Sequence, residues 1–143
     1  MTFDEINSIC VAIIATDVKY DFFSKKFLLI FKPEYGYDES IKEKTFKITF
    51  NNCIYFIAAS SSKMAITGQT EFTSWGKHTS DLCDENNCIN LLNSYLSDKP
   101  GAGFEKSFLR NDISDKKIDH YYFYNRLGDD IDLLAESTQV DEI

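Results

Sequence analysis

The chain has 143 residues, with 23 acidic and 15 basic side chains, a formal net charge of −8 and a hydrophobic share of 43%. Twelve Phe and eight Tyr exclude a disordered chain, and the acidic balance argues against binding to the phosphate backbone of nucleic acids. The longest apolar run, Ile9–Ala15, is too short to cross a bilayer, and the acidic start argues against a secretory signal. We therefore expect one acidic, cytoplasmic domain over residues 1–143.

The first half of the chain predicts a short helix followed by strands. Thr2 and Glu5 have the spacing of a capping box, which predicts a helix over residues 3–10. β-branched and aromatic residues then favour four strands, over Val11–Tyr20, Lys25–Lys32, Glu43–Phe50 and Cys53–Ala59. Pro33 and Gly36 are expected to end the second strand, because proline lacks the N–H that a strand ladder uses.

The second half predicts one further helix and a closing hairpin. Met64–Trp75 is expected to be an edge strand or a long connection, and an apolar stripe predicts a helix from Asp84 to Leu96. Further strands are expected over Phe104–Leu109, Ile118–Arg126 and Asp130–Ser137, with a frayed tail at residues 138–143. The predicted fold is α+β, a mostly antiparallel sheet of six to eight strands with a short N-terminal helix and one helix near residues 85–96.

The polar residues that could carry metal or catalytic chemistry are few. Asp81, Cys83 and Cys88 lie near His78, but the second ligand pair of a structural zinc site is missing. We expect no metal, no cofactor and reduced cysteines. His78 and His120 are the only histidines, and no nucleophile elbow, phosphate loop or dinucleotide motif is present, so no catalytic residue is assigned.

The charge of the last third indicates a binding surface instead. Residues 111–143 hold nine acidic and three basic side chains, and no basic residue follows Asp129. Strand alternation places carboxylates on one face of the last predicted strand, beside a tyrosine-rich strand, and such surfaces suit a basic protein partner. The predicted partner-binding residues are Asp129, Asp130, Asp132, Glu136, Tyr122, Tyr124 and Trp75. The alternative to a binding surface is a solvated sheet edge whose charges deter aggregation.

Two segments resemble the immunity proteins of bacterial contact-dependent growth inhibition and related polymorphic toxin systems. They are the alternating run 46–56 and the closing hairpin 121–135. The resemblance implies a cytoplasmic protein that binds one cognate toxin domain, often a nuclease, and covers or distorts its active site. It implies no residue roles.

Two other functions stay open. The first is a small-ligand or peptide-binding domain, which a deep apolar cavity would favour. The second is a small hydrolase that uses His78 or His120. Binding of nucleic acid or membrane is not expected, and the oligomeric state is left open.

Overall fold

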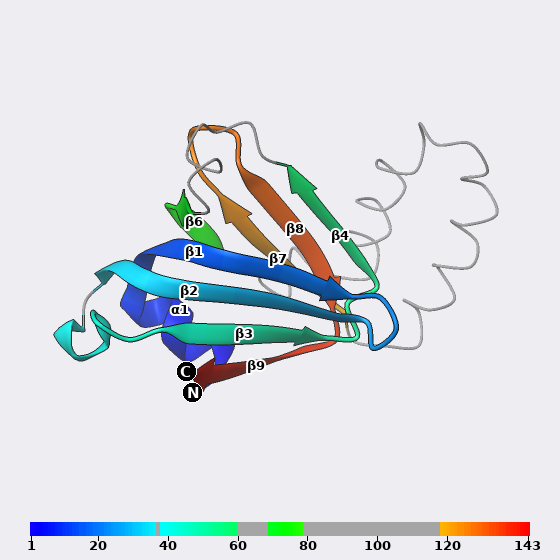
Figure 1. Ribbon diagram of the computed structural model, residues 1–143, viewed down its shortest axis with the longest axis horizontal. Helices are drawn as coiled ribbons and strands as arrows, with labels where there is room; N and C mark the ends of the chain where they lie inside the picture. The colour runs from blue at the N-terminus through cyan, green and yellow to red at the C-terminus, as the bar shows by residue number, and fades with distance from the viewer. Residues whose placement is uncertain (37, 60–68, 79–117) are drawn as a thin grey trace.

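The computed structural model describes residues 1–36, 38–59, 69–78 and 118–143 (Figure 1). The elements in chain order are α1 (Phe3–Ile9), β1 (Cys10–Asp21), β2 (Lys26–Gly36), the 3-10 helix η1 (Glu39–Ile41), β3 (Phe46–Asn51), β4 (Tyr55–Ala59), β5 (Thr70–Phe72), β6 (Ser74–Lys77), β7 (Asp119–Tyr124), β8 (Asp130–Ala135) and β9 (Ser137–Glu142). The helix predicted near residues 85–96 and the strand predicted at 104–109 lie outside the described residues.

The strands form two sheets in which every neighbouring pair is antiparallel. Sheet A has the order β5-β1-β2-β3-β9, and sheet B has the order β4-β8-β7-β6. The α+β, mostly antiparallel prediction is confirmed in this coarse form. The described ranges alone contain nine strands in two sheets, which is more than the six to eight strands expected in one sheet.

At two corners the chain passes between the sheets with only one residue between consecutive strands. Thr73 separates β5 in sheet A from β6 in sheet B, and Glu136 separates β8 in sheet B from β9 in sheet A. Helix α1 contacts β1 and β9 of sheet A and β6 of sheet B, so it bridges the two sheets at one end (Figure 1). Its capping box is confirmed, because Thr2 and Glu5 exchange backbone-to-side-chain hydrogen bonds of 2.6 and 3.2 Å.

One hydrophobic core lies between the sheets. Alternate residues of β2 and β3 are fully buried on the inner face of sheet A, as the period of two predicts. Phe50 joins the layers, since its ring lies 6.3 Å from that of Phe3 on α1 and 5.1 and 6.1 Å from those of Tyr121 and Phe123 on sheet B. Such aromatic pairs add to the free energy gained from apolar burial.

Two boundary predictions are wrong by more than three residues. β2 does not end at Pro33 but continues to Gly36, because the ladder to β3 stops at Phe31 and Pro33 therefore has only β1 beside it. Residues 138–143 are not a frayed tail. β9 pairs with the whole of β3, and Val140 packs into the core.

Cys10 and Cys53 are buried free thiols, as predicted. Burial raises the pKa of Cys10 to about 11 and that of Cys53 to about 12, so both stay protonated.

In the part of the chain that the structure describes, no helix is long and apolar enough to cross a bilayer.

Candidate functional site

The outer face of sheet B gathers six polar and aromatic side chains, which we call the outer patch. On β7, Tyr121 and Phe123 face the core, so the alternating residues lie on the opposite face; on β8, Ile131 and Leu133 face the core in the same way. The outer patch consists of His78, His120, Tyr122, Tyr124, Asp130 and Asp132. The strand register brings Tyr122 opposite Asp132 and Tyr124 opposite Asp130.

Asp132 is the centre of the hydrogen bonding in this patch. Its Oδ1 accepts a hydrogen bond of 2.5 Å from the Tyr124 hydroxyl and lies 2.8 Å from Nε2 of His120. Burial alone would raise the pKa of Asp132, but the hydrogen bonds from His120 and Tyr124 and the two nearby imidazoles outweigh it, so the pKa lies below its usual value. Burial and the bond to Asp132 raise the pKa of Tyr124. Near neutral pH the carboxylate is therefore ionised and the phenol protonated.

The two histidines of the chain meet in the outer patch. The ring centroid of His78, which follows β6, lies 4.3 Å from that of His120 and 4.9 Å from that of Tyr122. Burial lowers the pKa of His78, and the neighbouring His120 lowers it further, against a smaller opposite effect of Asp132. His78 is therefore uncharged near neutral pH and does not cancel the negative charge of the two aspartates.

Tyr122 and Tyr124 are stacked, with ring centroids 5.2 Å apart and ring planes 28° from parallel. Both rings are half-buried. Because Tyr124 is tied to Asp132 and Tyr122 packs against both Tyr124 and His78, the patch presents an ordered aromatic surface.

Three of the seven predicted partner-binding residues lie outside the outer patch. Trp75 lies in the core, 6% exposed, where its indole N–H donates to the Cys10 carbonyl oxygen at 3.1 Å. Asp129 is 2% exposed and shapes the β7–β8 turn, accepting a hydrogen bond of 3.0 Å from the Asn125 amide. Glu136 is exposed at the β8–β9 corner.

The six carboxylates from Asp129 onward do not form one acidic surface. Asp141 and Glu142 lie on β9, at the edge of sheet A, where they pair with Lys47 and Lys44 at 3.8 and 3.0 Å. Of the three carboxylates predicted on one face of the last strand, Glu136 lies at the corner, and only Asp130 and Asp132 lie beside the tyrosines.

The patch contains one arrangement typical of acid–base chemistry. A carboxylate hydrogen-bonded to an imidazole holds that ring in one orientation and tautomer, as in catalytic dyads. Among the described residues no group of three or more His, Cys, Asp or Glu side chains is placed to hold a metal. The metal-capable residues Asp81, Cys83 and Cys88 lie outside the described residues.

An open hollow of about 620 Å³ lies beside the patch at the β7–β8 turn end of sheet B. Its lining includes Glu71, Ser74, Tyr124, Arg126 and Leu127, which are exposed or half-buried, so the hollow is shallow and open to solvent. It is unlike the deep apolar cavity that the small-ligand alternative requires.

Sequence reasoning placed Tyr122, Tyr124, Asp130 and Asp132 on exposed strand faces but did not bring His78 to them. His78 reaches the outer patch because β6 pairs with β7. This pairing sets Lys77 opposite Tyr121, so His78 lies beside His120. Comparison of the chain with family models, with curated proteins and with solved structures finds no match, so the geometry of the outer patch is the basis for a functional proposal.

Proposed function

We propose that the protein is an immunity protein: a non-enzymatic binding protein that neutralises a cognate, basic toxin domain, such as a nuclease, by occluding its active or substrate-binding surface. The observation that carries the proposal is the pairing of two stacked tyrosines with two aspartates on the outer face of sheet B. The net charge of −8 supports attraction to a basic partner at a distance.

The aromatic half of the patch suits a protein interface. Tyrosine combines a large apolar ring with a polar hydroxyl and is enriched among the residues that dominate binding energy. Because Tyr124 is held by Asp132 and stacked on Tyr122, little side-chain freedom remains to be lost on binding. An Arg or Lys of the partner can lie over the face of these rings.

The acidic half of the patch supplies charge complementarity. Asp130 is half-buried on the same face and opposite Tyr124 in the register, so a cation lying on the tyrosines also lies close to this carboxylate. Complementary charges of this kind mainly raise the association rate and exclude wrong partners.

Co-expression with a basic toxin domain, sought among the genes next to the one that encodes this chain, tests the proposal, with cell growth and association kinetics as readouts. We expect Asp130→Asn to slow association and flatten its dependence on salt, and Tyr122→Ala to raise Kd about tenfold. The matched control is Asp141→Asn, which removes an equal charge at the edge of sheet A and should change neither. Wild-type binding by both patch variants would place the interface elsewhere.

The meeting of His78 and His120 favours one second candidate, a hydrolase that uses the His120–Asp132 pair. The double variant His78→Gln/His120→Gln separates the two functions. Full protection of cells by this variant excludes acid–base chemistry, whereas loss of protection with unchanged toxin binding would favour the hydrolase over occlusion.

A further inference from the structure

The tip of the β1–β2 hairpin exposes two phenylalanines. Phe22 and Phe23 are 74% and 96% exposed, which makes them the most exposed large apolar side chains of the described residues. Their rings touch edge to face, with centroids 5.8 Å apart. Adjacent apolar rings displayed in this way mark an interaction site more often than a scattered apolar residue does.

The turn that carries these rings is ordered. Asp21 Oδ1 accepts hydrogen bonds from the backbone N–H groups of Phe23 and Ser24, at 3.0 and 3.3 Å. Lys25 completes the turn with a left-handed φ of 53°. Since the backbone is already fixed, insertion of the rings into a partner costs little ordering entropy.

The two ends of this hairpin carry opposite charge. Residues 18–26 at the tip hold three lysines and one aspartate, net +2, while residues 34–43 at the other end hold four acidic residues and one lysine, net −3. β2 alone separates them by eleven residues, or about 36 Å at about 3.3 Å per residue. The tip of one chain therefore cannot reach the acidic end of the same chain.

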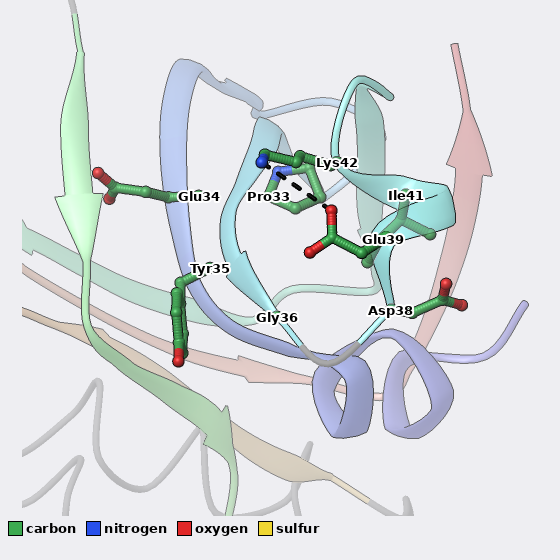
Figure 2. A pocket seen from close by; sticks show the side chains of 8 residues that line it. All are labelled: Pro33, Glu34, Tyr35, Gly36, Asp38, Glu39, Ile41 and Lys42. Carbon is green, nitrogen blue, oxygen red and sulfur yellow. Dashed lines mark ion pairs between the residues drawn. The ribbon is translucent and has the colours of Figure 1, made fainter.

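The acidic end contains a hollow of about 150 Å³ between the end of β2 and η1. Pro33 and Ile41 are its buried apolar lining residues, and the exposed pair Glu39–Lys42, at 3.9 Å, lies on its rim (Figure 2). A volume of about 150 Å³ is enough for a benzene ring, and the polar part of the lining, which includes Glu34, Asp38 and Glu39, places carboxylates around it. Tyr35, which also lines the hollow, is 66% exposed and is the third most exposed large apolar side chain of the described residues.

We propose that the chain self-associates head to tail, with Phe23 of one copy inserted in the hollow at the acidic end of the next. Lys25 and Lys26 would then face Glu34 and Glu39 of the neighbouring copy. The exposed Glu39–Lys42 pair contributes little stability and can open to admit the ring. Such a contact uses two different surfaces, so it repeats into a chain or closes into a ring. It uses neither the outer patch nor the proposed partner, and it stands independently of the proposed function.

Sedimentation of the full chain over a range of concentrations tests the proposal. We expect the average mass of the wild type to rise with concentration, and the association to weaken between about 0.1 and about 1 M NaCl as the Debye length falls from about 10 to about 3 Å. The tip variant Phe22→Ser/Phe23→Ser and the acidic-end variant Tyr35→Ser/Glu39→Lys should each be monomeric. Circular dichroism verifies that both are folded.

The decisive experiment is sedimentation of a mixture of the tip variant and the acidic-end variant. Each keeps one intact end, so the mixture should give one-to-one dimers and nothing larger. Leu127→Ser removes an exposed apolar side chain at a different turn and should associate like the wild type.

Two results would overturn the proposal. The first is a monomeric wild type at every concentration; if that wild type also floats with phosphatidylcholine–phosphatidylglycerol vesicles while the tip variant does not, the tip is a membrane contact instead. The second is a mixture that stays monomeric or forms assemblies larger than dimers.

Discussion

Removal of one hydroxyl from the outer patch tests its hydrogen-bond network. In Tyr124→Phe the aromatic ring stays, and only the hydrogen bond to Asp132 is lost. A hydrogen bond to a charged group contributes about 1.5–3 kcal/mol. The Asp132 side chain is 18% exposed, so water can compensate in part, and we expect the lower end, about 1.5 kcal/mol, by the same rule.

Urea unfolding at pH 7 measures this loss, with the fluorescence of the buried Trp75 as the probe. The matched control is Tyr122→Phe, which deletes a hydroxyl two residues away that does not bond to Asp132 and should change the unfolding free energy by less than about 0.5 kcal/mol. Equal losses in the two variants would refute the network.

The same variant has a pH signature whose sign follows from the lowered pKa of Asp132. A carboxylate with a pKa below its unfolded value stabilises the fold above that value, and this contribution disappears as the pH falls through the folded pKa. The deficit of Tyr124→Phe should therefore be full at pH 7 and shrink in acid below about pH 4, near the ordinary Asp pKa. A deficit that grows in acid would contradict the argument.

Three further predictions concern the core, a histidine and a glycine. Phe50→Ala should cost about 3–5 kcal/mol in urea unfolding, because its ring joins both sheets and α1; a loss below about 1 kcal/mol would mean that the layers pack independently. Because the pKa of His78 is lowered in the fold, the unfolded chain takes up this proton first, so stability should fall as the pH drops below about 6.5. His78→Gln should flatten that slope, and an unchanged slope would assign it to other groups. Gly36→Ala should cost about 1–3 kcal/mol in thermal or urea unfolding, since a Cβ there would lie 2.4 Å from the Ile9 carbonyl oxygen; wild-type stability would show that the backbone yields.

Local patterns predicted the elements that depend on neighbours in sequence. The capping box at Thr2 gave α1, and alternation gave the faces of β3, β7 and β8, because the direction of a side chain along a strand depends only on the period of two. Neither pattern contains information on which strand lies beside which. The division into two sheets, and the meeting of His78 with His120, depend on pairings between distant segments.

Two residues whose positions were predicted wrongly, Glu136 and Trp75, lie at or next to the corners where the chain passes between the sheets. Alternation continued past Ala135 put Glu136 on the face of Asp132, but the chain turns there from sheet B into sheet A, and the period of two does not survive the bend. Trp75 was predicted to bind a partner from the end of an edge strand or long connection. It instead lies in a four-residue strand whose inner face is part of the core.

The two aspartates of the outer patch, Asp130 and Asp132, have different roles because they differ in their hydrogen bonds. Asp132 is held by Tyr124 and His120, so Asp132→Asn should first weaken the fold and then, through disorder of the tyrosines, the binding of a partner. Among the described residues Asp130 has no comparable hydrogen-bond network, and Asp130→Asn should change association with the toxin domain at constant stability. If Asp132→Asn lowered the association rate as much as Asp130→Asn without any loss in urea unfolding, both carboxylates would act as docking charges and the network would be incidental. The reverse, a stability loss in Asp130→Asn, would show that Asp130 also has a structural role and would leave no carboxylate of the outer patch free to act only as a docking charge.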